Sequence, residues 1–192
     1  ILEAQEGLVT FTYRVDSVDA IRAEDQYGGF TLKLIATYET LKEVVYIDIT
    51  TGDSLTPREV NYCFLSLFND EELSIQAYNI ETVLAEKIET VISRAEASTR
   101  PRDRYDIFNL YQLRQNELDM VVLKKAIQNT FQTRENTENL MNWRASIKKL
   151  KESEYQKELW RRYQEAFRYA HGLSFEEPIE TIEMILTQLF HD

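Results

Sequence analysis

The chain has 192 residues, of which 43% are hydrophobic and 11% aromatic, so it can bury a core as one large or two small domains. Its net charge of −11 argues against a surface coated for nucleic acid. A single cysteine excludes an internal disulfide framework. Because no apolar run is long enough to span a membrane, we expect a cytoplasmic protein that has no membrane partner.

The charge is unevenly distributed along the chain. Residues 100–171 carry 15 Lys and Arg against 10 Asp and Glu, so this segment is basic within an acidic protein. It is either a place where a polyanion such as RNA binds or an ordinary solvated face of helices. Four aromatic residues in it are either stacking groups for RNA bases or parts of a helical core: Tyr155, Trp160, Tyr163 and Tyr169.

The first 50 residues, and a short segment further on, show the alternation and β-branched composition of strands. We predict strands at residues 8–15, 16–22, 30–38, 44–49 and 73–78. Gly28 and Gly29 are expected to form a turn. Cys63 lies in an apolar run and is predicted to be a buried, inert thiol. The sequence therefore predicts a small, largely antiparallel sheet.

From residue 79 onward the hydrophobic period changes to that of α-helices. Helices are predicted at residues 79–95, 102–114, 118–132, 139–151, 154–171 and 176–190. Asn79 can cap the first, Pro101 can start the second and Gly172 can end the fifth. Strands followed by helices without return indicate an α+β fold, with a β-rich part at 1–78 and a helical domain at 79–192.

Lys87 stands where the predicted helix of residues 79–95 should be apolar. The apolar positions 80, 83, 84, 88, 91 and 92 fall on one face of this helix. Lys87 lies within this stripe, and Arg94 projects from nearly the same line seven residues later. A buried ammonium without a partner is costly, so Lys87 must either extend to solvent or meet an anion.

Asp48 is a second unusual position, because it is flanked by isoleucines in the predicted strand 44–49. Alternation places Val44, Tyr46 and Asp48 on one face. Asp48 is therefore either an edge residue in solvent or a carboxylate held in a cleft.

The run from Arg100 to Tyr111 holds the third unusual feature. Ile107, Leu110, Tyr111 and Leu113 define the inner face of the predicted helix. Asp103 projects near the centre of this face, and Asp106 near its edge. Asp106 would gain from a cationic partner, and Lys87 or Arg94 can provide one. The cluster is either a structural ion-pair network or an active site.

These three segments together resemble the AbiEii/AbiGii abortive-infection nucleotidyltransferases, the toxins of bacterial type IV toxin–antitoxin systems. The segments are Ile47-Asp48-Ile49, Leu84-Ala85-Glu86-Lys87 with Arg94, and Arg102-Asp103-Arg104-Tyr105-Asp106, in the family's order and with its spacing. The likeness extends from about residue 8 to residue 115.

The resemblance implies a nucleotidyltransferase fold, with the remainder of a mixed sheet followed by a helical bundle. It implies that Asp48 is a Mg²⁺ ligand and that Lys87 contacts the phosphates of a nucleoside triphosphate, with Arg94 as a second nucleotide-binding residue. Asp103 or Asp106 matches the acidic residue of the family's last motif. An acceptor such as RNA, a role in phage defence and an antitoxin that is a transcriptional regulator are further expectations.

The sequence departs from the family pattern at the metal site. The family's Gly-Gly or Gly-Ser turn followed by Asp-x-Asp is missing before Asp48, since Gly28-Gly29 is followed by Phe30-Thr31-Leu32-Lys33. We expect these metal ligands upstream of Ile1, so this chain alone is expected to be inactive. The alternative function is a non-enzymatic helical interaction module in which the charged residues form only a structural ion-pair network.

Overall fold

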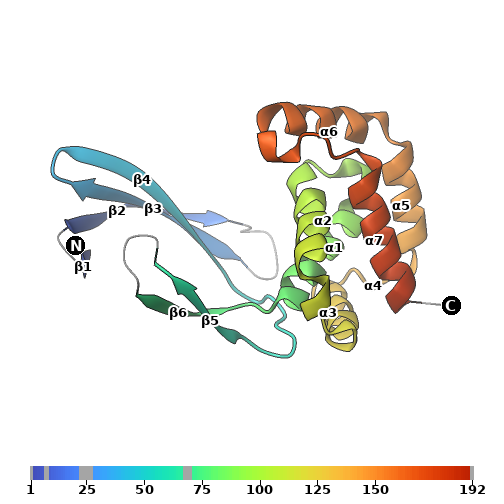
Figure 1. The fold of residues 1–192 in the computed structure, drawn as a ribbon, viewed down its shortest axis with the longest axis horizontal. Coiled ribbons are helices and arrows are strands. Elements are labelled where there is room, and N and C mark those ends of the chain that lie inside the picture. Colours follow the sequence, from blue (N-terminus) through green and yellow to red (C-terminus); the bar gives the residue numbers. More distant parts are fainter. Residues whose placement is uncertain (1, 7–8, 22–27, 67–70, 191–192) are drawn as a thin grey trace. The chain divides into compact units, whose positions relative to one another are not determined.

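A computed structural model describes residues 2–6, 9–21, 28–66 and 71–190 of the chain (Figure 1). The chain divides into two compact units, Ile1–Asp53 and Ser54–Asp192. The first unit is made of strands. The second contains a β-hairpin and all the helices of the described residues. This arrangement confirms the predicted α+β class.

The first unit is a four-stranded antiparallel sheet of order β1-β2-β3-β4 (Figure 1). Its strands are β1 Leu2–Glu6, β2 Val9–Ile21, β3 Gly29–Tyr38 and β4 Leu41–Thr50. The segments predicted as two strands at 8–15 and 16–22 form one long strand, because a bulge between Val15 and Ser17 lets the pairing with β3 continue. β1 was not predicted. All the described strand pairs are antiparallel, so the parallel pairing of a mixed sheet is not among them.

Gly29 is the first residue of β3 and pairs with Thr50 of β4, so it does not form the predicted turn with Gly28. A Cβ atom at this position would lie 2.5 Å from the carbonyl oxygen of Ile49. Only glycine therefore allows the two strands to approach each other here.

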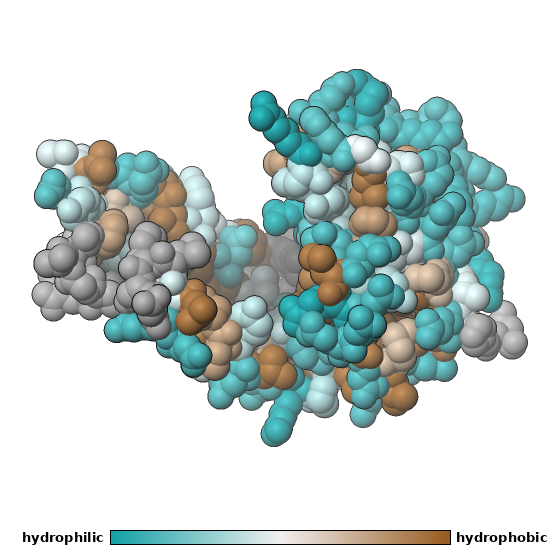
Figure 2. Space-filling view, in the orientation of Figure 1, coloured by the Kyte–Doolittle hydropathy of each residue, from teal (hydrophilic) through white to brown (hydrophobic). Residues whose placement is uncertain are grey.

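Many apolar side chains of this sheet are in contact with solvent (Figure 2). Among the sheet residues whose burial is described, Leu34 is the hydrophobic residue that is buried. Along β4, residues of both faces are exposed, among them Val44 and Tyr46 on one face and Ile47 and Ile49 on the other. The alternation predicted for this strand is present, but neither face of β4 is buried.

The second unit begins with a hairpin of β5 Val60–Leu65 and β6 Glu72–Ala77. β6 confirms the predicted strand at 73–78, whereas β5 was not predicted. Cys63 is exposed on β5, so the prediction of a buried thiol was wrong. A two-stranded hairpin leaves both faces accessible unless another layer covers it, and an apolar neighbourhood in sequence does not reveal this.

Seven α-helices follow in the described residues: α1 Ile80–Arg94, α2 Pro101–Arg114, α3 Met120–Thr133, α4 Thr137–Met141, α5 Trp143–Glu152, α6 Glu154–Ala166 and α7 Glu176–Leu189. The predicted helix at 139–151 is two helices, α4 and α5. α6 ends at Ala166 and a 3₁₀ turn follows, so Gly172 does not end this helix as predicted. Among the described residues, no helix is long and apolar enough to cross a membrane.

α1 is the central helix of the second unit and packs against α2, α3, α4 and α5 (Figure 1). Leu84, Ile88 and Ile92 from its apolar stripe are almost completely buried. Ile107 of α2 and Ile127 of α3 meet them in one continuous core. The stripe that the sequence predicted is therefore the centre of the helical core.

Asn79 fixes the start of α1 as predicted. Its side-chain oxygen accepts a hydrogen bond from the backbone N–H of Thr82, 3.2 Å away, as an N-cap does. Its amide nitrogen donates to the carbonyl oxygen of Thr56 at 2.8 Å. The buried Thr56 also exchanges hydrogen bonds with the Thr82 hydroxyl and accepts one from Asn129 of α3. This network holds the loop before β5 against the first turn of α1.

We predict that Asn79→Ala lowers the free energy of unfolding by about 1–3 kcal/mol, because the cap is lost and the buried Thr56 carbonyl loses a donor. Urea denaturation followed by circular dichroism measures this. Asn116→Ala, at an exposed position, is the matched control and should change stability by less than about 0.5 kcal/mol. Equal stability of the two variants would contradict the proposed anchoring role.

Candidate functional site

Lys87 lies between two carboxylates of α2. Its ammonium Nζ donates a hydrogen bond to Oδ2 of Asp106 at 2.6 Å and a longer one to Oδ1 of Asp103 at 3.3 Å. The Asp103 side chain is only 4% exposed, whereas those of Lys87 and Asp106 are 22% and 23% exposed. The cation in the apolar stripe of α1 therefore meets an anion, and it remains accessible from solvent.

Two arginines at the start of α2 surround this cluster. Nε of Arg100 lies 2.9 Å from Oδ2 of Asp103, and Nε of Arg102 lies 3.7 Å from Oδ2 of Asp106. Nη2 of Arg100 donates a hydrogen bond to Oδ1 of Asp103 at 3.5 Å, whereas Oδ2 of the buried Asp103 accepts no hydrogen bond. Because both guanidinium groups are well exposed, they can turn towards a ligand at little cost.

The loop that carries Arg100 is fixed by a buried glutamine of α6. Nε2 of Gln156 donates hydrogen bonds to the carbonyl oxygens of Glu96 and Ser98, at 2.8 and 2.6 Å. The Ser98 hydroxyl in turn accepts a hydrogen bond from the backbone N–H of Arg100. α2 begins at Pro101, as predicted, since the fixed φ of proline suits the first helical position. α6 therefore helps to set the position of the arginines.

A pocket of about 560 Å³ opens beside Lys87, between the start of α2 and α6. Its charged lining residues are four cations and two carboxylates: Lys87, Arg100, Arg102, Arg162, Asp103 and Asp106. The excess of positive charge in a chain of net charge −11 favours an anionic ligand. The volume is in the range of small-molecule sites.

Besides Arg162, α6 contributes Leu159 and Tyr163 to this pocket, and Phe167 follows directly after the helix, so most of this wall is apolar and aromatic. Burial raises the pKa of the Tyr163 hydroxyl, and its contact with the Tyr169 hydroxyl at 3.0 Å adds to this effect. Of the four aromatic residues noted in the sequence, Trp160 and Tyr163 belong to the core, whereas Tyr155 and Tyr169 are exposed.

The other two predicted site residues lie outside this pocket. Arg94 is exposed at the end of α1, where a cation is favourable for the helix dipole, and no ion pair joins it to Asp103 or Asp106 among the described residues. Asp48 belongs to the first unit. Its Oδ1 accepts a hydrogen bond from the Thr31 hydroxyl at 2.6 Å, and the residue is exposed on the edge strand β4. The sequence allowed Asp48 to be either an edge residue in solvent or a carboxylate in a cleft. The structure shows the solvent-exposed edge position.

The described residues do not provide a complete magnesium site. No group of three or more His, Cys, Asp or Glu in them is arranged to hold a metal ion. Asp48 pairs with Thr31 across the sheet, and Thr31 pairs with Asp19, so the two carboxylates are separated by a full strand. Asp48 is thus the carboxylate that the described part of the sheet offers at the Thr31 hydroxyl, and water and substrate phosphates would have to complete the coordination of Mg²⁺.

Arg104 is a buried cation that was not among the predicted site residues. Its guanidinium lies over the rings of Trp160 and Phe175, at 5.4 and 5.2 Å from their centroids. Both terminal nitrogens are buried without a hydrogen-bond partner, and burial lowers the pKa of Arg104 to about 10. Helical spacing gave a signal, because Arg104 lies about 60° from Ile107 on the inner face of α2. Leu113, about 120° from Ile107, was predicted on this face but is exposed.

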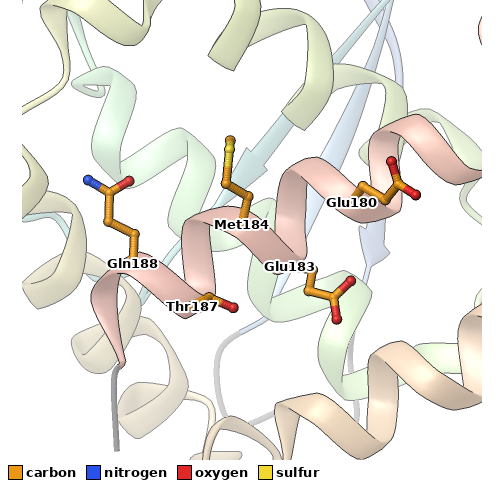
Figure 3. A pocket seen from close by; sticks show the side chains of 5 residues that line it. All are labelled: Glu180, Glu183, Met184, Thr187 and Gln188. Carbon is orange, nitrogen blue, oxygen red and sulfur yellow. The ribbon is translucent and has the colours of Figure 1, made fainter.

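Two other hollows lack the combination of features found at Lys87. One of about 530 Å³ is formed by side chains of α7 alone, including Glu180 and Glu183, and has no cation in its lining (Figure 3). Another of about 780 Å³ has two cations, but Lys124 lies over the ring of Phe190 and Arg144 over that of Trp143. In this hollow each cation already stacks on an aromatic ring.

We predict that Arg104→Met equals or exceeds the wild type in free energy of unfolding at pH 7, since it removes a buried charge and keeps most of the volume. Arg104→Ala, the matched variant, should lose about 2–4 kcal/mol because it leaves a cavity between two rings. Thermal and urea unfolding test this. A Met variant as unstable as the Ala variant would show that the charge itself stabilises the fold.

The same residue predicts a dependence on pH. Burial lowers the pKa of Arg104 to about 10 in the folded state, below that of an arginine in the unfolded chain, so the folded state releases its proton first. Stability conferred by this group therefore rises as pH increases above about 10. The stability of the wild type relative to Arg104→Met should increase between pH 8 and pH 10.5. A constant difference over this range would contradict the pKa shift.

Comparison with known proteins identifies the chain. Neither a curated protein nor a solved structure matches it significantly. A family model described as "Nucleotidyl transferase AbiEii toxin, Type IV TA system" matches residues 2–185. The match extends well beyond residue 115, where the resemblance in sequence motifs ended, and includes α6 and most of α7. The chain therefore belongs to the AbiEii family of nucleotidyltransferase toxins of type IV toxin–antitoxin systems.

Proposed function

We propose that the protein transfers a nucleotide from a nucleoside triphosphate to an acceptor such as RNA, and that Lys87 contacts the phosphates of the donor. The observation that carries this proposal is the accessible Lys87 ammonium in a pocket with excess positive charge. The family of the chain supports the reaction class, and a toxin of this type has a cognate antitoxin.

The chemistry requires little of the protein beyond position and charge. The acceptor oxygen forms a bond to the α-phosphorus, the bond from this phosphorus to the β-phosphate oxygen breaks, and pyrophosphate leaves while the hydroxyl proton is released. Negative charge that develops on the phosphate oxygens is stabilised by fixed cations. Lys87 is held in place by α1 and by two carboxylates, so its ammonium is already oriented before a ligand binds.

Binding of phosphates at Lys87 requires an exchange of partners. In the structure Asp106 is the closest anion to Lys87, at 2.6 Å. A phosphate oxygen would take this place, and Arg102, which is 75% exposed in its side chain, can stay with Asp106 or turn to the ligand. Asp103 is buried and keeps Lys87 oriented in both states. In this proposal Asp106 is the carboxylate that responds to the ligand, and Asp103 is a positioning residue.

Mg²⁺ is part of the proposal, with Asp48 as one ligand. Bound magnesium would neutralise charge on the triphosphate. We further propose that the antitoxin is a transcriptional regulator, that the protein acts in the bacterial cytoplasm during phage defence, and that the 192-residue chain alone is inactive.

We predict that Lys87→Met reduces nucleotide transfer by at least about 100-fold, as expected when one fixed cation is removed from a charged transition state. The assay uses protein from the complete reading frame, Mg²⁺, radiolabelled nucleoside triphosphates and total RNA. Growth inhibition on induction should be lost in parallel. Lys148→Met is the matched control, because Lys148 is exposed in a weak pair with Glu152 at 4.0 Å.

The same variant separates this proposal from the alternative of a non-enzymatic helical interaction module. The observation that favours the alternative is that Lys87, Asp103, Asp106 and the two arginines already form a paired network. If the network is only structural, a folded Lys87→Met protein should inhibit growth like the wild type. Circular dichroism of the variant shows whether it is folded, so that loss of function is not confused with loss of structure.

A further inference from the structure

The pocket beside Lys87 has two chemically different sides. The side that α1 and the start of α2 form is charged, with Lys87, Arg100 and Arg102. The α6 side presents Tyr163 and, directly after the helix, Phe167, and the centroids of their rings lie 5.0 Å apart. A ligand that fills the pocket would meet cations on one side and aromatic rings on the other.

Phe167 is the aromatic residue of this wall that remains open to solvent. It is 43% exposed, whereas Tyr163 beneath it is buried. No cation stacks on its ring among the described residues, unlike the rings of Trp143 and Phe190 in the largest hollow described above. An exposed phenylalanine at the rim of a charged pocket offers a free surface for another flat group.

The ring of Phe167 is also held in place before any ligand binds. Its centroid lies 5.0 Å from that of Tyr163 and 5.4 Å from that of Tyr169. Its backbone N–H donates to the carbonyl oxygens of Tyr163 and Gln164, which fixes the end of α6. A ring that is already ordered loses little entropy on binding.

The cationic side is suited to phosphates. Arginine side chains bind phosphate oxygens with two parallel donors, and those of Arg100 and Arg102 are exposed. Arg162 of α6 adds a further cation to the lining, although it donates a hydrogen bond to Glu158 at 2.9 Å. A nucleotide combines the two groups that these sides select, a flat base and a chain of phosphates.

We propose that Tyr163 of α6 and Phe167 directly after this helix form the subsite for the base of the donor nucleoside triphosphate, with Phe167 stacking on it. This inference rests on the proposed function and adds to it the aromatic residues that recognise the base of the nucleotide. Stacking on an aromatic ring accepts every base, so the subsite distinguishes nucleotides from bare phosphates more strongly than it distinguishes one base from another. The volume of about 560 Å³ suits a mononucleotide and is too small for a folded RNA.

Isothermal titration of protein from the complete reading frame tests the subsite. Each of the four nucleoside triphosphates and inorganic tripolyphosphate is titrated with Mg²⁺ into the wild type, Phe167→Ala, Phe167→Trp and Lys87→Met. Phe167→Ala should weaken nucleotide binding by about 5- to 100-fold and leave tripolyphosphate binding unchanged. Phe167→Trp should restore nucleotide binding. Tyr155→Ala is the matched control, because Tyr155 is an exposed aromatic residue of the same helix outside the pocket.

The outcomes separate this inference from the proposed function. If Phe167→Ala binds nucleotides like the wild type while Lys87→Met binds them weakly, the base subsite is wrong and the phosphate contact stands, even if Phe167→Ala loses affinity for RNA. Equal losses for tripolyphosphate and nucleotides in Phe167→Ala would also overturn the subsite. If the wild type binds neither ligand, or if Lys87→Met binds both normally, the proposed function fails together with the subsite.

Discussion

The contact of Lys87 with Asp103 and Asp106 is the constraint around which the helical unit is built. An ammonium in the apolar stripe of the central helix is tolerated only if an anion reaches it, and the first two turns of α2 provide two. This requirement fixes how α2 lies on α1. It also places Arg100 and Arg102 beside the cluster, because they lie three and four residues before the carboxylates with which they pair.

The fold could be predicted from the sequence where local signals were strong. The stripe of α1, the Asn79 cap and Pro101 at the start of α2 depend on neighbours within a few residues. The exposure of Cys63 and Leu113 could not be predicted in this way, since it depends on which elements cover β5 and the last turn of α2. β1 and β5 are short, and a strand becomes evident only through its pairing partner.

The candidate site was predictable to the same extent. The sequence offered Lys87 or Arg94 as the cationic partner of Asp106, and in the structure the partner from α1 is Lys87. The aromatic wall was not predicted as part of this pocket, because Phe167 is more than sixty residues from Asp103 and joins it only when α6 packs on α2. Arg104 was missed for a different reason. Its position on the inner face was readable, but arginine is seldom buried without a carboxylate.

The ion pairs of Lys87 limit how much affinity an anionic ligand can gain by binding to it. Lys87 is already paired in the structure, so a phosphate that replaces Asp106 exchanges one ion pair for another and gains little from that contact alone. Net affinity must come from groups that are less tightly paired. In the described pocket these are Arg102, whose exposed side chain lies 3.7 Å from Asp106, and the solvent-exposed part of the Phe167 ring. A small inorganic anion reaches only the first of these groups, whereas a nucleotide reaches both, so the paired cluster itself selects against bare phosphate.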